Sequence, residues 1–321
     1  MLAAAFVHRP DVFPDVYAPV LDRIRARADI VYGPAALPDL SRLGDVEVLL
    51  TSWGAPVLDE ALLSGLPRLK LVLYAAGSVR TFVTPEFWAR GIPLVSAYRA
   101  NAVPVADFTY AQIIYALKGG WRYALEARTA KAPVQRVPQP GLYGSRVGLV
   151  SLGAIGRLVV DRLRALAVDV MAYDPFAGPY DGVRMVELEE LFATGDVVSV
   201  HTPLLDQTRG LVGRELLSSM RPGATLINTA RGAILDEAAL VEVLAGRPDL
   251  FAALDVTDPE PPAPGSPLFT LPNVVLTPHI AGSLGAERGL LGELVAGELE
   301  RFADGLPLEH ALTREAAERL A

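Results

Sequence analysis

The sequence predicts an α/β protein built from two doubly wound domains, each with a mostly parallel sheet. The first observation is that short apolar runs alternate with helical patterns along the whole chain, which is typical of parallel α/β sheets. The second is length, because 321 residues exceed the usual size of one domain and suit two. Hydrophobic residues make up 51% of the chain, so it can bury two large cores.

The first part of the chain has three clear strand candidates with helical stretches between them. These strands are Leu2–Val7, Val46–Thr51 and Leu69–Tyr74. Another helix is expected to begin near Pro85, and a long helical pattern runs from about Val103 to Lys131. The Pro-rich segment Ala132–Gly144 follows, and a loop of this length is uncommon inside a compact domain. It is either a crossing between domains or an arm over a partner subunit.

The second α/β unit follows this loop, and its strands match two mononucleotide-binding halves of a doubly wound sheet. The expected strands are Arg146–Val150, Val168–Tyr173, Val197–His201, Thr225–Asn228, Phe251–Asp255 and Val274–Thr277. The tail Leu284–Phe302 has a helical pattern and is expected to return to the first domain. The predicted division is therefore a discontinuous domain, 1–98 with 286–321, and a continuous one, 99–285.

Composition excludes several classes of function. The net charge is −8 and no Lys-Arg block is present, whereas nucleic-acid binding requires a basic face. The sequence has no cysteine, so thiolate chemistry and sulfur-ligated metals are ruled out, and no other metal-ligand cluster is visible. No apolar run reaches the roughly 18 residues that would cross a bilayer, and Leu2–Val7 is too short for a signal peptide. We therefore expect a cytoplasmic protein without membrane partners.

A glycine-rich turn follows the strand Arg146–Val150. The segment Ser151-Leu152-Gly153-Ala154-Ile155-Gly156 nearly matches G-x-G-x-x-G, with Ser151 in the first position. In this motif Gly153 allows close approach of a pyrophosphate, Gly156 allows close helix–sheet packing, and the helix N-terminus offers free N–H groups. Serine fits the first position if its φ is negative. A glycine pair at such a turn is also compatible with packing alone.

Asp174 strengthens the nucleotide interpretation. It follows the strand Val168–Tyr173, about 20 residues after the glycines, where a carboxylate can accept hydrogen bonds from the adenosine ribose hydroxyls. The same carboxylate would repel a 2′-phosphate, so the pattern predicts a Rossmann domain that prefers NAD. The alternative for Asp174 is a turn-initiating Asp-Pro pair.

Three side chains with catalytic potential follow three strands of the same predicted sheet. Arg231 comes after Thr225–Asn228, Glu260 lies in a Pro-flanked turn after Phe251–Asp255, and His279 follows Val274–Thr277. Ligands bind outside the carboxyl ends of strands in open α/β sheets, so these side chains are placed for function. His201 also ends a strand and is similarly placed. The remaining histidines, His8 and His310, are expected at the surface.

These segments resemble the D-isomer-specific 2-hydroxyacid dehydrogenase family, from about Leu49 onward and most strongly from Gly148 to Gly282. The resemblance implies a Rossmann domain that binds NAD and a flavodoxin-like substrate domain, with the active site in the cleft between them. It implies His279 as general acid/base, Glu260 as its partner, and Arg231 as the ligand of the substrate carboxylate and carbonyl. It also implies a homodimer.

The resemblance extends to cofactor and substrate contacts. Cofactor contacts are expected at Ser151, Gly153, Ala154, Ile155, Gly156, Asp174, His201, Thr202, Pro203, Thr229, Ala230, Asp255 and Gly282. Asp255 resembles the partner of the nicotinamide carboxamide. In the first domain, the backbone N–H groups of Gly77 and Ser78 are expected to hold the substrate carboxylate. Trp53 is expected to form a pocket wall, and the alternative is an ordinary core or rim tryptophan. The family commonly has Gly where Ser78 stands and Asp or Asn where Arg80 stands, which leaves the substrate open.

The expected activity is NAD-dependent interconversion of a small 2-keto acid and its D-2-hydroxy acid, as in glyoxylate/hydroxypyruvate reductases. One alternative is a phosphoglycerate dehydrogenase-like enzyme, although the regulatory domain of its longer forms is missing from this sequence. Another is an NAD-sensing corepressor-type binding protein, which would keep the same three residues but usually carries a longer tail. Formate dehydrogenases share the fold but have Gln where Glu260 stands. Arg80 is expected to point outward into solvent, and an inward orientation would favour dianionic substrates.

Overall fold

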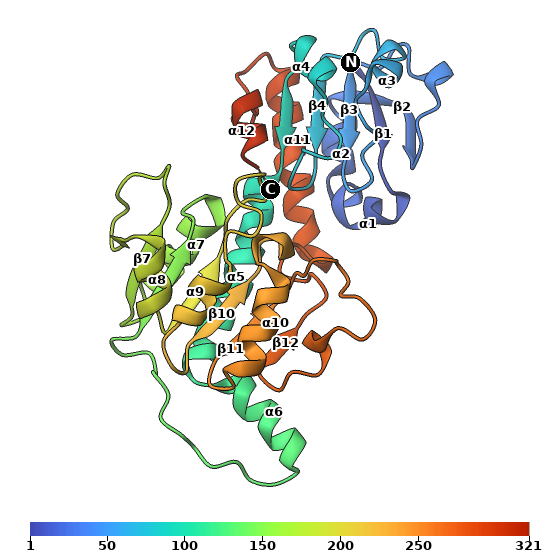
Figure 1. The fold of residues 1–321 in the computed structure, drawn as a ribbon. Coiled ribbons are helices and arrows are strands. Elements are labelled where there is room, and N and C mark those ends of the chain that lie inside the picture. Colours follow the sequence, from blue (N-terminus) through green and yellow to red (C-terminus); the bar gives the residue numbers. More distant parts are fainter. Residues whose placement is uncertain (321) are drawn as a thin grey trace. The chain divides into compact units, whose positions relative to one another are not determined.

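The structure is a computed structural model that describes residues 1–320, and its chain forms two compact units. Unit 1 comprises Met1–Asn101 and Ser283–Ala321, and unit 2 comprises Ala102–Gly282. The chain thus passes from one unit to the other after Asn101 and after Gly282, against expected crossings at 98/99 and 285/286. Each unit has its own parallel sheet (Figure 1).

Unit 1 has a five-stranded parallel sheet in the order β2-β1-β3-β4-β5. This is the flavodoxin-like order, in which the first crossover reverses direction between the first and third strands. Its strands are β1 (Leu2–Val7), β2 (Ala28–Ala35), β3 (Val48–Thr51), β4 (Leu71–Tyr74) and β5 (Leu94–Ser96). Its helices are α1 (Phe13–Val16), α2 (Leu21–Arg25), α3 (Glu60–Ser64), α4 (Pro85–Ala89), α11 (Gly289–Ala303) and α12 (Arg314–Glu318).

The sequence pattern does not predict two strands of unit 1. β2 is an edge strand with mostly exposed or half-buried residues, so it has no continuous apolar run. β5 has only three residues, all buried, which is too short to give a pattern. The tail helix is α11, and it packs against α1 and α2 of unit 1, as the helical pattern of the tail predicts.

Unit 2 has a seven-stranded parallel sheet in the order β12-β11-β10-β9-β6-β7-β8, which matches a Rossmann sheet with one further strand. Its strands are β6 (Arg146–Val150), β7 (Asp169–Tyr173), β8 (Arg184–Met185), β9 (Val197–Val200), β10 (Thr225–Asn228), β11 (Phe251–Leu254) and β12 (Val274–Leu276). The two-residue strand β8 was not expected. The fold class predicted from the sequence is therefore confirmed in both units.

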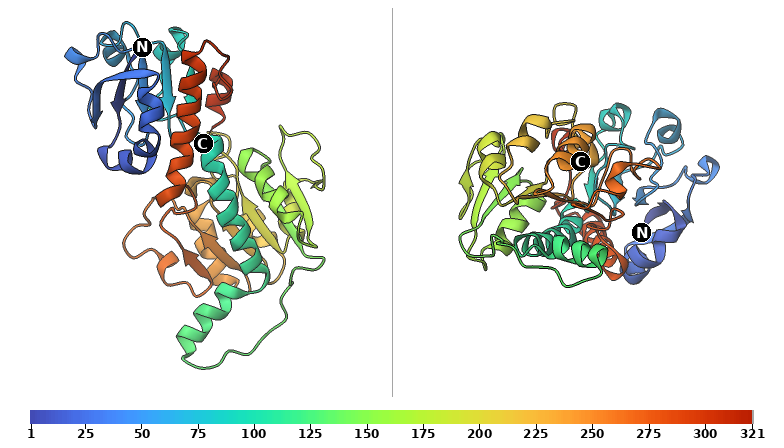
Figure 2. Two further views of the ribbon diagram at one scale, coloured as in Figure 1. Left: turned by 180° about the vertical axis from the view of Figure 1, so that it is seen from behind. Right: turned by 60° about the horizontal axis from the view of Figure 1, so that its bottom comes forward.

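Helices cover both faces of the unit 2 sheet. The helices α8 (Leu188–Thr194), α9 (Arg214–Ser219) and α10 (Glu237–Gly246) share one hydrophobic core with the sheet. The helices α5 (Tyr98–Leu117) and α7 (Ala154–Leu163) belong to the core on the other face, and the two views in Figures 1 and 2 show these opposite sides. A ligand of unit 2 must therefore approach a strand end and not a sheet face.

The long helix expected from Val103 to Lys131 is two helices. Helix α5 begins five residues earlier, at Tyr98, and the chain turns at Gly119 (φ 66°) before α6 (Gly120–Ala130). No residue of α6 is buried. Together with the Pro-rich segment that follows, α6 projects from the rest of unit 2 as an arm (Figure 1).

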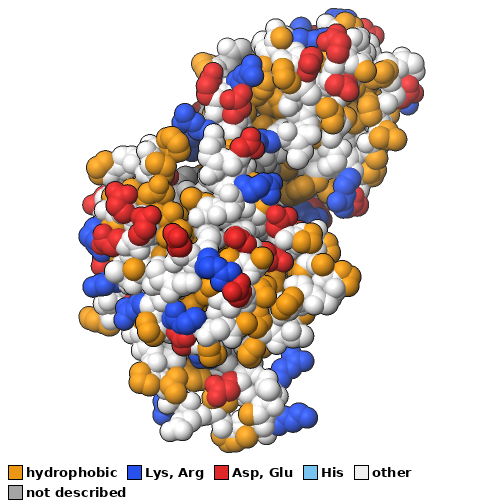
Figure 3. Space-filling view, viewed as in Figure 1, with side chains coloured by type: hydrophobic (Ala, Val, Ile, Leu, Met, Phe, Trp, Pro, Cys, Tyr) orange, Lys and Arg blue, Asp and Glu red, His pale blue; other side chains and the backbone are white. Residues whose placement is uncertain are grey.

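The expectation that His8 lies on the surface is wrong. Its ring is fully buried and stacks on the rings of Phe13 and Tyr17, and burial lowers its pKa. His310 is half-buried rather than exposed. Lysines, arginines and acidic residues are intermixed on the face drawn in Figure 3. Within residues 1–320, no helix is long and apolar enough to cross a membrane.

Candidate active site

Three neighbouring strands of unit 2 deliver the three candidate catalytic residues to one edge of the sheet. Strand β11 lies between β10 and β12, and Leu254 is in register with Asn228 on one side and Leu276 on the other. Arg231, Glu260 and His279 lie three to six residues beyond these strand ends. Because the strands are parallel, all three segments leave the sheet at its carboxyl edge.

His279 and Glu260 form a direct pair. The imidazole Nδ1 lies 2.6 Å from Glu260 Oε1, and the two side chains are 46% and 40% exposed. A carboxylate at Nδ1 fixes the ring orientation and the tautomer, which leaves Nε2 available to a ligand. The pair therefore has the geometry of a general acid/base with an orienting carboxylate.

Asp255 holds the segment that carries His279. Its carboxylate is buried and accepts hydrogen bonds from Thr277 Oγ1 (2.6 Å), Ile280 N (2.9 Å) and Ala281 N (2.9 Å). Its backbone carbonyl accepts from His279 N at 2.9 Å. His279 has a φ of 55°, which costs about 1–3 kcal/mol for a residue with a side chain and requires support from its surroundings. Asp255 supplies that support, whatever else it binds.

The loop that carries Arg231 is also fixed by side chains. Asn228 accepts from Ala230 N (3.0 Å) and donates to Arg231 O (2.9 Å). The hydroxyls of Thr229 and Thr109 lie 3.0 Å apart in a buried position. Arg231 is half-buried, and its Nη1 donates to Ala230 O. The guanidinium is thus partly oriented by its own loop.

The glycine-rich turn joins β6 to α7 as expected, with one difference. The position where a Cβ of Gly153 would lie has no atom within 4 Å, whereas a Cβ on Gly156 would lie 2.3 Å from the Ser151 carbonyl oxygen. Gly153 therefore leaves room for a phosphate at the free N–H groups of α7, and Gly156 is required by packing. Ala154 and Ile155 form the first turn of α7 between them.

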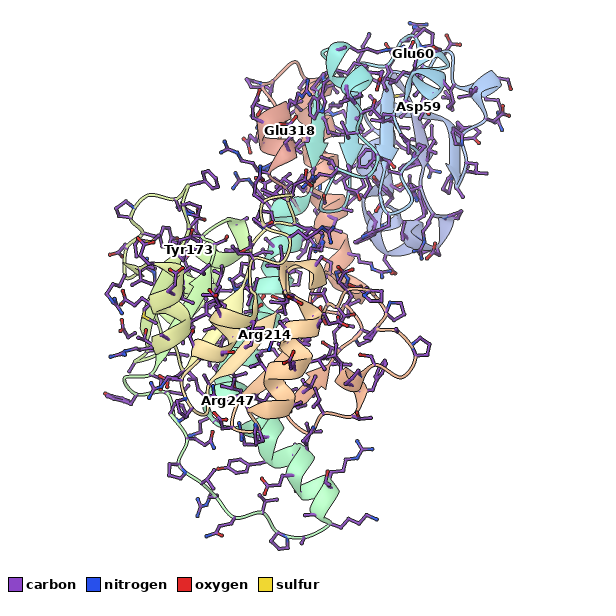
Figure 4. The ribbon with its side chains drawn as sticks, in the orientation of Figure 1. Asp59, Glu60, Tyr173, Arg214, Arg247 and Glu318 are labelled. Atoms are coloured by element: carbon purple, nitrogen blue, oxygen red, sulfur yellow. The ribbon has the colours of Figure 1, made fainter. Side chains whose placement is uncertain are left out.

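Ser151 does not have the negative φ on which its fit to the motif depends. Its φ is 83°, in the left-handed region that glycine occupies without cost. Its backbone N–H donates to the carbonyl of Tyr173, a residue labelled in Figure 4, and its hydroxyl lies 3.1 Å from Thr202 Oγ1. The turn keeps the glycine conformation, and hydrogen bonds offset part of the strain of the serine.

Asp174 lies beside this turn. One carboxylate oxygen accepts from Leu152 N at 2.8 Å, and the other from Phe176 N (2.8 Å) and Ala177 N (3.0 Å). The residue thus has the turn-forming role of an Asp-Pro pair and also faces the glycine-rich turn. Since an ionised carboxylate accepts about four hydrogen bonds, it can accept from a ribose hydroxyl in addition.

His201 is a buried, neutral histidine next to the same turn. Its Nε2 lies 3.0 Å from Ser199 Oγ, and its Nδ1 has no hydrogen-bond partner. Burial lowers its pKa from 6.5 to about 4. The next two residues bend the chain away from β9: Thr202 Oγ1 donates to Val150 O, and Pro203 O accepts from Thr208 Oγ1. The segment His201–Pro203 is thus held in place by hydrogen bonds, and His201 is uncharged at neutral pH.

The candidate substrate residues of unit 1 also follow strands. Gly77 and Ser78 are half-buried and follow β4, and Ser78 Oγ lies 3.4 Å from Arg80 N. Trp53 follows β3, is half-buried, and has the Arg288 guanidinium 5.5 Å from its ring centroid. Arg80 is exposed. Trp53 is therefore a partly buried residue that packs against the hydrophobic cores of unit 1 and has a cation over its ring.

The sequence pattern did not indicate several residues that hold the loops of the site in place from outside the three candidate catalytic residues. Thr109 supports Thr229 from helix α5, and Gly232 approaches the backbone of Thr257 so closely that a Cβ would lie 1.9 Å from its carbonyl carbon. Glu237 accepts from Asp258 N at 3.0 Å. No local pattern indicates these contacts, because each joins segments at least 20 residues apart in sequence.

The comparisons with known proteins agree with this geometry. Residues 110–281 match the family model described as "D-isomer specific 2-hydroxyacid dehydrogenase, NAD binding domain". The chain is 33% identical to a D-3-phosphoglycerate dehydrogenase of Archaeoglobus fulgidus over 79% of this chain and 49% of the relative. It is 33% identical to a glycerate dehydrogenase of Methylorubrum extorquens over 76% of this chain and 79% of the relative.

A solved structure resembles the whole chain. The TT0316 protein of Thermus thermophilus has a TM-score of 0.77 and 31% identity, with coverage of 98% of this chain and 100% of that chain. The chain spans about half the length of the phosphoglycerate dehydrogenases it matches. The family model covers the site of unit 2, and the glycerate dehydrogenase extends the likeness to most of the chain. The chain belongs to the D-isomer specific 2-hydroxyacid dehydrogenase family.

Proposed function

We propose that the protein is an NAD-dependent oxidoreductase that interconverts a small 2-keto acid and its D-2-hydroxy acid. The main support for the proposal is the His279–Glu260 pair, with 2.6 Å between Nδ1 and Oε1. The pair follows strands of the same sheet as the glycine-rich turn. When bound, NADH supplies a hydride to C2 of the keto acid. The residues of the chain then have to provide a proton and hold the acid.

The proton comes from His279. Its Nδ1–H donates to Glu260, so Nε2 of the imidazolium donates its proton to the C2 oxygen as negative charge develops there. Glu260 stabilises the cation in the forward direction and fixes the neutral tautomer that accepts a proton in the reverse direction. A pair of this kind commonly contributes about 10²–10⁴-fold to the rate.

The keto acid is held by its carboxylate. Arg231 provides a planar guanidinium that suits a carboxylate in a bidentate arrangement, and its position is braced by Asn228. From unit 1 we assign the backbone N–H groups of Gly77 and Ser78 to the same carboxylate, and Trp53 to the wall beside the substrate side chain. These roles follow from the family resemblance and the positions of the residues after strands β3, β4 and β10.

NAD fits the glycine-rich turn of unit 2. The open space at Gly153 accommodates the pyrophosphate, and the N-terminus of α7, with Ser151, Ala154, Ile155 and Gly156, provides the donors and the close packing. Asp174 is assigned to the adenosine ribose. The nicotinamide end is assigned to the residues that follow strands β9 to β12, namely His201, Thr202, Pro203, Thr229, Ala230, Asp255 and Gly282.

For the substrate we propose a small keto acid such as glyoxylate or hydroxypyruvate. A phosphoglycerate dehydrogenase-like activity is the second candidate, and the 33% identity to enzymes of that name favours it. An NAD-sensing binding protein without turnover is the alternative outside the enzyme class, because it would keep the same pair.

We further propose that the protein forms a homodimer through the arm of unit 2. No residue of α6 is buried. In the Pro-rich segment that completes the arm, Tyr143 is 90% exposed and Val137 is 52% exposed. Large apolar side chains that are exposed on a projecting segment favour a protein interface. Light scattering on the whole chain tests this, and a monomer at micromolar concentration contradicts it.

The experiment that tests the proposed activity is NADH oxidation on a panel of glyoxylate, hydroxypyruvate, phosphohydroxypyruvate and oxaloacetate, repeated with NADPH. Turnover that His279→Gln abolishes supports the reaction and the role of the pair. Binding of NADH without turnover on any acid refutes the enzyme proposal and favours the sensor. Preference for phosphohydroxypyruvate selects the second candidate.

A further inference from the structure

We propose that Glu237 is a positioning residue: it holds the turn that carries Glu260, and so keeps the Glu260 carboxylate in hydrogen-bonding position to His279. The proposal rests on the proposed function, because that function requires the Glu260 carboxylate to orient His279 and stabilise its cation. It concerns unit 2 alone. It goes beyond the three candidate catalytic residues because Glu237 acts on them only through the backbone.

The contact joins the first turn of α10 to the Pro-flanked turn. Glu237 is the first residue of α10, whose N-cap Asp236 accepts from Ala239 N at 3.0 Å. Glu237 Oε2 accepts a hydrogen bond from the backbone N–H of Asp258 at 3.0 Å. Asp258 precedes Glu260 by two residues. The bond therefore fixes the backbone of the turn close to the residue that carries the Glu260 carboxylate.

Two other segments hold the turn from different directions. The backbone of Gly232 packs on Thr257, where a Cβ would lie 2.0 Å from the Thr257 carbonyl oxygen. Arg209 reaches the carboxylate of Asp258, with 3.4 Å between Nη1 and Oδ2. Of these contacts, the Glu237 bond is the one that a side chain makes to the turn backbone, so it can be removed without changing the turn sequence.

The pair needs this support because it is exposed. With 46% and 40% of the two side chains exposed, the His–Glu contact is screened by solvent and contributes little stability by itself. It is too weak to immobilise a loop, because each loop residue that is fixed loses backbone conformational entropy. The Glu260 carboxylate is therefore positioned by the turn, and the turn by its three neighbours.

Glu237 also has an ordinary structural role that must be separated from this one. An acidic residue in the first turn of a helix interacts favourably with the helix dipole through its charge. The hydrogen bond to Asp258 N requires only an acceptor oxygen. Glu237→Gln keeps an acceptor and removes the charge, whereas Glu237→Ala removes both, so the two variants distinguish the roles.

The test compares Glu237→Ala, Glu237→Gln and a control on the same helix, Glu242→Ala, with Glu260→Gln as the reference for a pair that has lost its carboxylate. Glu242 forms an ion pair with Arg214, which Figure 4 labels, and lies away from the turn in sequence. For each protein we measure kcat and KM for the best keto acid, the pH profile of kcat/KM, the NADH dissociation constant, and amide hydrogen exchange at Asp258.

We expect Glu237→Ala to lower kcat about tenfold, because small misplacements of catalytic groups cost up to about 10²-fold. Its pH profile should move toward that of Glu260→Gln, its NADH dissociation constant should stay unchanged, and Asp258 should exchange faster. Glu237→Gln and Glu242→Ala should keep kcat within about twofold of the wild type and retain the slow exchange. A general loss of helix stability would not change the pH profile in this way.

Three results would overturn the proposal: a wild-type kcat and pH profile in Glu237→Ala, equal losses in the Ala and Gln variants, or an equal loss in Glu242→Ala. Hydrogen exchange gives an answer that does not depend on turnover. If the wild type oxidises no NADH, the proposed function fails; if the wild type is active and Asp258 exchanges equally in all variants, only this inference fails.

Discussion

His201 should make unit 2 sensitive to acid. Its ring is buried, and burial lowers its pKa from 6.5 to about 4. Between these values the unfolded chain binds a proton that the folded protein does not, so protonation favours unfolding. The stabilisation is fully present above pH 6.5 and is lost as the pH falls toward 4.

The size of the effect follows from the two pKa values. A difference of one pKa unit corresponds to about 1.4 kcal/mol, so the gap between 6.5 and about 4 gives roughly 3 kcal/mol at pH 4. This is a large part of the 5–15 kcal/mol typical of a domain. Protonation of carboxylates lowers stability in the same range, so the histidine has to be isolated by comparison.

The assay compares the wild type with His201→Asn over pH 4 to 7. The free energy of opening is measured in urea from the exchange of backbone amides in β6 and β9, which belong to unit 2. At pH 7 the variant should be the less stable protein, because its Ser199 contact and packing are changed. The wild type should then lose about 3 kcal/mol more than the variant as the pH falls to 4.

A difference between the two proteins that stays constant from pH 7 to pH 4 would refute this reasoning. It would mean that the imidazole is protonated in the fold or is hydrated there. His310→Gln in unit 1 provides the control for removing a histidine, and it should leave the pH dependence of the β6 and β9 amides unchanged.

Four other substitutions test the site. His279→Gln should lower kcat by about 10²-fold or more and leave NADH affinity intact in fluorescence titrations; near wild-type turnover would remove His279 from the mechanism. Asp174→Ala should narrow the preference for NADH over NADPH by weakening NADH, and a wild type that prefers NADPH would contradict the role of Asp174. Gly232→Ala should lower kcat/KM by about tenfold or more and reduce the thermal midpoint, because its Cβ would overlap the Thr257 carbonyl; unchanged kinetics would show that the loop yields freely. Arg80→Ala should change KM slightly and equally for glyoxylate and oxaloacetate if Arg80 points outward, whereas a selective rise for oxaloacetate would indicate an inward side chain.

Local sequence patterns were sufficient for most elements of both sheets and for the order of residues along the site edge. The central strands β9, β10 and β11 of unit 2 are buried on both faces, so they form nearly continuous apolar runs. Parallel pairing brings the carboxyl ends of the strands to one edge. Arg231, Glu260 and His279 could be assigned to that edge because each lies within six residues of the end of an apolar strand. The glycine-rich turn was recognisable because Gly153 and Gly156 are required by close approach and close packing.

The tertiary structure decided what depends on contacts between distant segments. His8 is buried against the rings of Phe13 and Tyr17. Ser151 has a φ of 83°, a conformation that a serine rarely adopts. Edge strand β2 has no apolar run because few of its residues are fully buried. Glu237 and Thr109 support the site from other helices. Sequence periodicity reports the face a residue presents within its own element, and it contains no information on which distant backbone group a side chain will meet.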